Sequence, residues 1–144
     1  KAALITLSIL STPIFSFAKH TDIFVVRHAE KLKGDDPVLT QKGQKRAESL
    51  KFLQEAFAVD ISGIYTSTAR RTNETATPLS NFVQKPIVND IGKTDFDTLF
   101  EDIKEKHEEK AVLVVGHTST IPKLIKYVNL CVNFFYSCLI NELK

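Results

Sequence analysis

Two histidines and three arginines are the residues of this sequence best suited to chemistry. They lie in three short segments, FVVRHAEK, STARRTNETA and VLVVGHTSTIP, which contain Arg27, His28, Arg70, Arg71 and His117. A guanidinium group is a planar fork of donors that binds a phosphate or a carboxylate through two points. A neutral imidazole can act as a nucleophile toward phosphorus. If these side chains converged, they would form a cationic pocket suited to a dianionic phosphate.

The elements that would have to position these side chains alternate along the chain. Apolar runs rich in β-branched and aromatic residues predict buried strands, at residues 22–28, 61–67, 85–89 and 111–117. Apolar residues three and four apart predict helices between them, at about residues 41–57, 68–82, 96–103 and 121–128. Strands that alternate with helices predict an α/β fold, a three-layer α/β/α sandwich with a mainly parallel sheet.

Three residues mark helix boundaries or irregularities. Thr40 and Asp95 precede two of the predicted helices and can accept hydrogen bonds from their first turns. Pro78 lies within the helix predicted at residues 68–82 and should limit or bend it.

The polar residues of interest fall at the carboxyl ends of the predicted strands, where open parallel sheets bind their ligands. Arg27 and His28 end the first strand, Ser67 ends the second, and His117 ends the last. This convergence, which depends on no comparison with other proteins, predicts one anion site.

Two choices stay open at this point. Consecutive residues of a helix point about 100° apart, so we expect only one of Arg70 and Arg71 to face the site, unless both form a solvated pair. Thr118 and its two neighbours can either cap the helix that follows or donate to an oxyanion.

Four ordered motifs over residues 22–128 resemble the histidine phosphatase superfamily, also called the phosphoglycerate-mutase-like family. They are VVRHAEK, which resembles the Arg-His-Gly or Arg-His-Ala signature, DPVLTQKGQKRAESL, IYTSTARRTNETA, and the second-histidine segment VLVVGHTSTIPKLI. The chain looks closest to short exported bacterial members.

The resemblance implies a role for each residue of the pocket. His28 would be the phosphorylated nucleophile, Arg27 and Arg71 would bind phosphate, and His117 would stabilise the transferring group. The family's spacing selects Arg71 over Arg70. Ser67 and Thr118 are candidates for further contacts with the substrate.

The proton donor for the leaving group is less clearly marked. Many members supply a Glu or Asp from a longer insert, whereas the segment from Val88 to Leu99 is short here. Asp90 and Asp95 are the candidates in this segment, although Asp95 is more simply a helix cap, and Glu30 is a further candidate by its proximity to His28. A weak or missing acid would restrict substrates to good leaving groups or phosphohistidine-like donors.

We therefore expect an acid-phosphatase-like enzyme that hydrolyses phosphomonoesters through a phosphohistidine intermediate, without a cofactor or metal. The alternatives are a phosphohistidine or phosphoprotein phosphatase and a degenerate phosphate-binding protein without turnover. The expected partner is a small phosphorylated substrate or a phosphoprotein. The formal net charge of +2 argues against nucleic acid, and the sequence leaves the oligomeric state open.

The start of the sequence predicts export. Residues 2–18 carry no charge and follow Lys1, and small residues at Ser16 and Ala18 match a signal-peptidase site. We expect a signal peptide at 1–18, a phosphatase-like domain at 19–144, and a periplasmic or secreted product without membrane attachment after cleavage. An uncleaved anchor is the main alternative, but 17 helical residues span only about 26 Å.

The end of the sequence is atypical. Residues 130–144, LCVNFFYSCLINELK, form a mostly apolar tail where the family usually continues into a last strand, which indicates that this strand is missing or altered. Cys131 and Cys138 are expected to be free or packed thiols, since no Cys/His cluster of zinc-site spacing is present. His20 and His107, which lie away from the strand ends, are expected to be exposed or processing-site residues without a part in the site.

Overall fold

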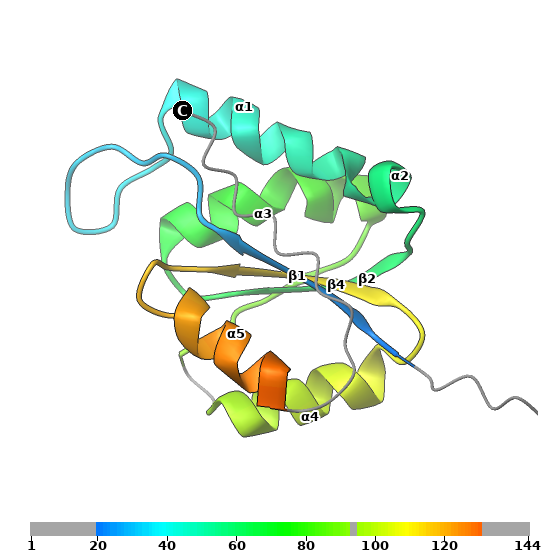
Figure 1. The fold of residues 1–144 in the computed structure, drawn as a ribbon. Helices are drawn as coiled ribbons and strands as arrows, with labels where there is room; N and C mark the ends of the chain where they lie inside the picture. The colour runs from blue at the N-terminus through cyan, green and yellow to red at the C-terminus, as the bar shows by residue number, and fades with distance from the viewer. Residues whose placement is uncertain (1–19, 93–94, 131–144) are drawn as a thin grey trace, which may run out of the picture.

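Four parallel strands form the centre of the molecule. The computed structural model describes residues 20–92 and 95–130. The strands are β1 (Asp22–Arg27), β2 (Ile61–Thr66), β3 (Ile87–Val88) and β4 (Ala111–Gly116), in the spatial order β1-β4-β2-β3. All three pairings are parallel, so the carboxyl ends of the strands lie at one edge, toward the left in Figure 1.

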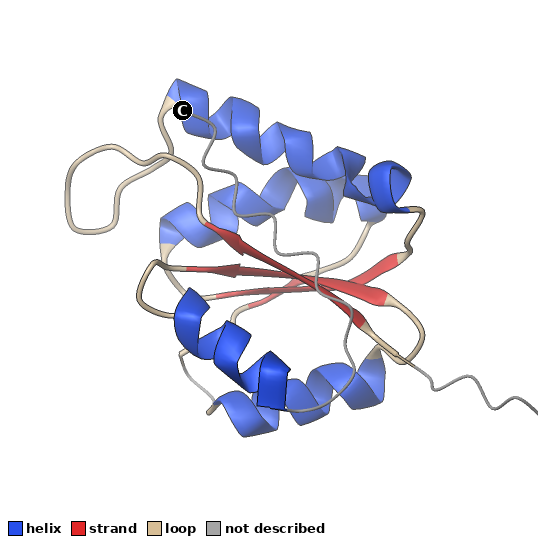
Figure 2. Cartoon of the chain, viewed as in Figure 1, coloured by secondary structure: helices blue, strands red, loops and turns tan. Residues whose placement is uncertain are grey.

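Helices cover both faces of this sheet (Figures 1 and 2). One face carries α1 (Gln41–Ser49), a 3-10 turn (Leu50–Phe52), α2 (Leu53–Phe57) and α3 (Arg70–Val83). The other face carries α4 (Phe96–Lys106) and α5 (Ile121–Leu130). The predicted three-layer α/β/α sandwich with a parallel sheet is thereby confirmed.

The packing follows from the alternation of side chains along the strands. In β4 every residue is buried, because this strand lies inside the sheet and is covered on both faces. Val112 and Val114 pack with α4 and α5, whereas Leu113 and Val115 pack with α2 and α3. The centre of the sheet is therefore rigid, and it fixes the positions of the residues that follow each strand.

Two helices differ from the sequence prediction. The helix expected at residues 41–57 is divided by the 3-10 turn, whose tighter winding breaks the expected apolar face. Leu53 is buried, but Phe57 is 40% exposed, although its ring packs at a tilt against that of Phe24, at 5.1 Å between centroids. Helix α3 continues past Pro78 to Val83, so this proline does not end it.

Two predicted helix caps are confirmed. The Oγ1 atom of Thr40 accepts the N–H of Gly43 at 3.0 Å, in the first turn of α1. The carboxylate of Asp95 accepts the N–H of Thr98 at 3.0 Å, in the first turn of α4.

Several predictions concern residues outside the described ranges. They concern the signal peptide at 1–18, the tail from residue 131 onward, and the two cysteines, Cys131 and Cys138. Export of the protein and the domain boundary at residue 19 therefore stay predictions. Within residues 20–92 and 95–130, no helix has the length and apolar character needed to cross a membrane.

Candidate active site

His28 is the first residue after β1 and is only 7% exposed. Its backbone N–H donates to the carbonyl of Gly116 at 3.0 Å, beside the end of β4. Its ring Nδ1 lies 2.8 Å from the carbonyl oxygen of Ala29. Because a carbonyl oxygen can only accept, Nδ1 carries the proton in the neutral ring and Nε2 keeps a lone pair. The atom available for nucleophilic attack is therefore Nε2.

The segment that carries His28 is held from both neighbouring helices. From α1, Nη2 of Arg46 donates to the backbone carbonyl of His28 at 2.9 Å. From α3, Oγ1 of Thr75 accepts the N–H of Ala29 at 2.9 Å and donates to the carbonyl of Arg71 at 2.7 Å. These contacts couple the position of the His28 ring to the helix that carries Arg71.

His117 is the first residue after β4 and faces His28, with 5.5 Å between the ring centroids. Its Nδ1 lies 3.4 Å from Nη2 of Arg71, and its Nε2 lies 2.8 Å from Oγ of Ser67. A guanidinium can only donate, so Nδ1 is the acceptor and Nε2–H donates to Ser67. The Ser67 hydroxyl also lies 2.9 Å from Oγ1 of Thr72, which extends the network into α3.

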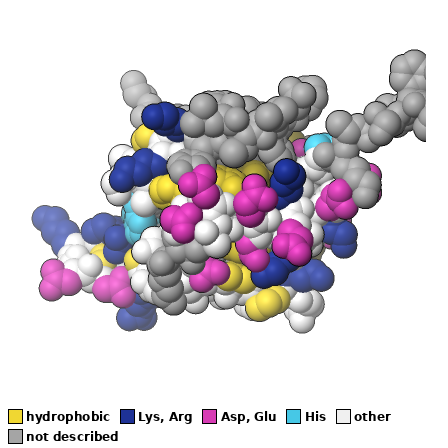
Figure 3. All heavy atoms as spheres, turned by 90° about the horizontal axis from the view of Figure 1, so that it is seen from below, with side chains coloured by type: hydrophobic (Ala, Val, Ile, Leu, Met, Phe, Trp, Pro, Cys, Tyr) yellow, Lys and Arg dark blue, Asp and Glu magenta, His cyan; other side chains and the backbone are white. Residues whose placement is uncertain are grey.

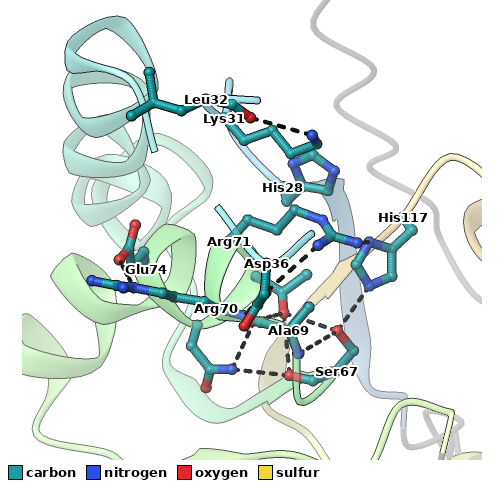
Figure 4. A network of polar contacts seen from close by, with 12 residues as sticks. His28, Lys31, Leu32, Asp36, Ser67, Ala69, Arg70, Arg71, Glu74 and His117 are labelled. Atoms are coloured by element: carbon teal, nitrogen blue, oxygen red, sulfur yellow. Dashed lines mark hydrogen bonds and ion pairs between the residues drawn. The ribbon is translucent and has the colours of Figure 1, made fainter. Parts of the chain in front are cut away.

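Arg71 points into the space between the two histidines, and Arg70 points away from it (Figure 4). The side chain of Arg70 pairs instead with Glu74, at 2.8 Å. The Nε atom of Arg71 is buried and has no hydrogen-bond partner among the described residues. Since an unsatisfied buried donor is costly, this N–H is suited to pairing with an anion in the pocket.

The electrostatics of the pocket favour neutral imidazoles. Burial lowers the pKa of His28 below its ordinary value of 6.5, and the charges of Arg27 and Arg71 lower it further. The hydrogen bond to the carbonyl of Ala29 raises the pKa, but it does not outweigh these effects. Burial also lowers the pKa of His117, with Arg71 and His28 acting in the same direction. Both rings are thus unprotonated near neutral pH, which is the form that a nucleophile requires.

Two of the remaining predicted binding residues lie around a cleft of about 730 Å³ that His28 lines. Arg27 and Thr118 line the same cleft, and both are exposed. Ser67 does not line this cleft, and neither do Arg71 and His117; Ser67 contacts His117 instead. Of the three hydroxyl residues after His117, Thr120 is the one that accepts the N–H of His117, at 2.8 Å. Seen from below, a histidine side chain is visible among Lys and Arg side chains at this end of the molecule (Figure 3).

Two of the carboxylates proposed as proton donors have other partners. Glu30 lines the cleft beside His28, but its Oε2 lies 3.4 Å from Nε of Arg46 and its Oε1 lies 4.0 Å from Nζ of Lys42. Asp95 caps α4, and its hydrogen bonds from Thr98 lower its pKa. Asp95 is therefore ionised at neutral pH and is placed as a helix cap, whereas Glu30 has the proximity but is ion-paired.

The structure adds residues that sequence reasoning did not select. Arg46 and Thr75 hold the segment around His28, and Asp36 lies 3.7 Å from Nη1 of Arg71. No local pattern marks Arg46, because its contact with the backbone of His28 depends on the packing of α1. Thr75 has a signal in the sequence, since it lies four residues after Arg71 on the same helix face.

One prediction about the remaining histidines is wrong. His107 is half-buried rather than exposed, because it packs against the amino-terminal part of β2. Its Nδ1 lies 2.7 Å from Oγ of Ser62 and its Nε2 lies 3.0 Å from the hydroxyl of Tyr65. These contacts hold α4 against the sheet, away from the site. His20 is exposed, as expected.

Within the described parts of the chain, no group of three or more His, Cys, Asp or Glu residues is placed to hold a metal ion.

Comparison with protein families identifies the fold and its signature. Residues 23–92, from β1 to the loop after β3, match the model of the histidine phosphatase superfamily, branch 1. Over these residues, just under half of the chain, the sequence resembles the histidine phosphatase superfamily. Members of this superfamily are phosphatases or mutases, so the resemblance supports phosphatase activity in general terms. The match ends before β4, so His117 enters the site from a part of the chain that the family model does not cover.

Solved structures agree with this histidine phosphatase fold. YhfR of Bacillus stearothermophilus is 22% identical, with a TM-score of 0.61 over 81% of this chain and 87% of that protein. A phosphoglycerate mutase of Plasmodium falciparum is 23% identical, with a TM-score of 0.57 over 78% and 70% of the two chains. A protein described as phosphohistidine phosphatase SixA, from Nakamurella multipartitia, is 24% identical, with a TM-score of 0.53 over 68% of this chain.

This chain spans 59% of the Nakamurella protein's length. No curated protein sequence matches the chain.

Proposed function

We propose that this protein is a phosphatase that hydrolyses phosphomonoesters through a phosphohistidine intermediate on His28. The observation that carries the proposal is the grouping of three side chains, in which His117 contacts both His28 and Arg71. The Nε2 lone pair of His28, the unpartnered Nε–H of Arg71 and the ring of His117 come from three separate elements. A nucleophile beside anion-binding donors is the combination that phosphoryl transfer requires.

In the first step, Nε2 of His28 attacks phosphorus, the new P–N bond forms, and the bond from phosphorus to the leaving oxygen breaks. Arg27 and Arg71 stabilise the charge on the equatorial oxygens, and His117 positions Arg71 by accepting a hydrogen bond from its Nη2. In the second step, water attacks the phosphohistidine, the P–N bond breaks, and inorganic phosphate leaves with neutral His28 restored.

Proton delivery to the leaving group limits the substrates. Asp95 is an ionised cap, and Glu30 is ion-paired with Arg46 and Lys42. An alkoxide that departs without a proton is a poor leaving group, so we expect phenolic esters to react faster than alkyl esters.

The same observation favours a second candidate, a phosphohistidine or phosphoprotein phosphatase. An imidazole leaves more readily than an alkoxide and needs less help from an acid. The description of the Nakamurella structure as a phosphohistidine phosphatase is consistent with this candidate.

The test is to trap the intermediate and to compare substrates. After incubation with a labelled aryl phosphate and rapid quenching, we expect a base-stable, acid-labile phosphate on the wild-type protein and none on His28→Ala. His20→Ala is the matched control, because it removes an exposed histidine outside the site. Equal turnover by His28→Ala and wild type would refute the proposal, and phosphate binding without any trapped label would indicate a degenerate protein.

Comparing phenyl phosphate, an alkyl phosphate and a phosphohistidine peptide then separates the two candidates. A phosphohistidine rate far above both ester rates would favour the second candidate. A rate on phenyl phosphate that is comparable with the rate on the phosphohistidine peptide would favour the first candidate, the phosphomonoester phosphatase.

We also propose export of the protein, supported by the uncharged segment at residues 2–18. Sequencing the amino terminus of protein recovered from the periplasm or medium tests this, and a start at Lys19 is the expected result.

A further inference from the structure

Asp36 lies beside Arg71, one of the residues that would hold phosphate. Its Oδ1 accepts the backbone N–H of Arg70 at 2.9 Å, in the first turn of α3. The same oxygen lies 3.7 Å from Nη1 of Arg71. Figure 4 shows this carboxylate between Arg71 and the start of the helix. A negative charge thus already faces two of the groups that make the pocket attractive to anions.

The fold sets the position of this carboxylate. Asp36 belongs to the loop between β1 and α1, whose base is closed by a bridge between Lys31 and Leu39. The N–H of Leu39 also donates to Oε2 of Glu74 at 2.7 Å, which ties the loop to α3 at a second point. The loop is therefore anchored on the helix that carries Arg71.

The geometry indicates that Asp36 acts through its charge. A separation of 3.7 Å is beyond hydrogen-bond distance, so Asp36 does not clamp the guanidinium. The side chain of Asp36 is 57% exposed, whereas that of Arg71 is 22% exposed and lies closer to His117, at 3.4 Å. Asp36 is thus the more exposed ion of the pair, on the solvent side of Arg71.

We propose that Asp36 is a resident counter-anion that weakens the binding of phosphate at this site and so favours release of the product. The inference rests on the proposed phosphatase function. Two arginines and a helix start would hold inorganic phosphate as well as they hold the substrate. A carboxylate that competes with phosphate for Arg71 lowers the affinity for the substrate and for inorganic phosphate alike. This loss does not slow the chemical step, because binding that is equally tight in the ground state and the transition state does not accelerate it.

The test compares variants by calorimetry with inorganic phosphate. Asp36→Asn removes the charge and keeps an oxygen that can accept the N–H of Arg70. We expect it to bind phosphate about two- to fivefold more tightly than wild type, the range of one exposed ion pair, with a smaller difference at high salt. Asp36→Glu, which keeps the charge, should stay within about twofold of wild type.

Asp35→Asn is the matched control, because it makes the same charge change one residue earlier on the same exposed loop. If Asp35→Asn raised the affinity for phosphate as much as Asp36→Asn does, the effect would come from the net charge of the protein alone, and the inference would be overturned. Unchanged or weaker phosphate binding by Asp36→Asn would overturn it as well, and so would a complete lack of phosphate binding by all variants.

Turnover separates this inference from the proposed function. In steady-state assays with an aryl phosphate, Asp36→Asn should lower both KM and the inhibition constant of phosphate. If the wild type binds phosphate but forms no phosphohistidine, the proposed function fails while the binding comparison still decides the role of Asp36.

Discussion

Thr75 offers a sharp test of how the pocket is held together. Its hydroxyl accepts the N–H of Ala29, next to His28, and donates to the carbonyl of Arg71. Thr75 is 2% exposed and Ala29 is fully buried, so these bonds are largely shielded from solvent. Thr75→Val keeps the shape of the side chain and removes both hydrogen bonds.

The expected cost follows from the buried N–H of Ala29. A buried donor left without a partner costs about 1–3 kcal/mol, which is a large part of a typical stability of about 5–15 kcal/mol. In a domain of this size, each kcal/mol lowers Tm by roughly 4 °C, so we expect a drop of roughly 4–12 °C. Because the same hydroxyl joins the His28 segment to α3, phosphate binding should weaken too.

Thermal unfolding followed by circular dichroism measures the effect, with Thr77→Val as the control. Thr77 lies on the same helix and is exposed, and its hydroxyl only donates to the carbonyl of Asn73 at 2.8 Å. This variant should change Tm by no more than about 2 °C, since exposed substitutions are usually within about 0.5 kcal/mol. Thr75→Ser should recover most of the loss. If Thr75→Val has the same Tm as Thr77→Val, the argument from the buried N–H of Ala29 is wrong.

Three further predictions concern pH and packing. Because the pKa of His28 is lowered from its ordinary value of 6.5, the midpoint of the acid limb that His28 contributes to kcat/KM should lie below pH 6.5; a midpoint above pH 6.5 would contradict this prediction. Burial also lowers the pKa of His107, so its contribution to stability is present above pH 6.5 and is lost on acidification. His107→Gln should therefore flatten the fall of Tm between about pH 7 and pH 5 relative to wild type. Gly43→Ala should destabilise the protein by about 1–3 kcal/mol, as measured by denaturant titration. The Cβ atom of the alanine would lie 2.2 Å from the carbonyl oxygen of Glu30, and this clash should outweigh the better helix propensity of Ala.

The sequence predicted the layers of the fold and the place of the site for physical reasons that can be named. The run AVLVVG is apolar at every position, as expected for a strand buried on both faces, and it forms β4. Arg27 ends β1, and His28 and His117 directly follow β1 and β4, whose carboxyl ends must meet in a parallel sheet. The preference for Arg71 over Arg70 needed only the angle between successive helical residues and the family's spacing.

What the sequence could not predict depends on contacts between distant segments. His107 is polar and follows a helix, so its neighbours predicted exposure, whereas its burial comes from packing against Ser62 and Tyr65 of β2. Asp36 lies in a turn-rich loop, and only the fold brings it to α3. The division of the helix at residues 50–52 likewise has no clear local signal.

The strand order β1-β4-β2-β3 has a consequence for how the protein is made. β1 and β2 are synthesised first but do not pair with each other, because β4 lies between them. Before residues 111–116 have been added, β1 and β2 therefore lack the strand that lies between them in the finished sheet. His117 follows β4 directly, so the contact between His117 and His28 requires that β4 has paired with β1. We expect nascent chains that end before β4 to expose apolar strand surface and to depend on chaperones, a dependence that should disappear once β4 has emerged.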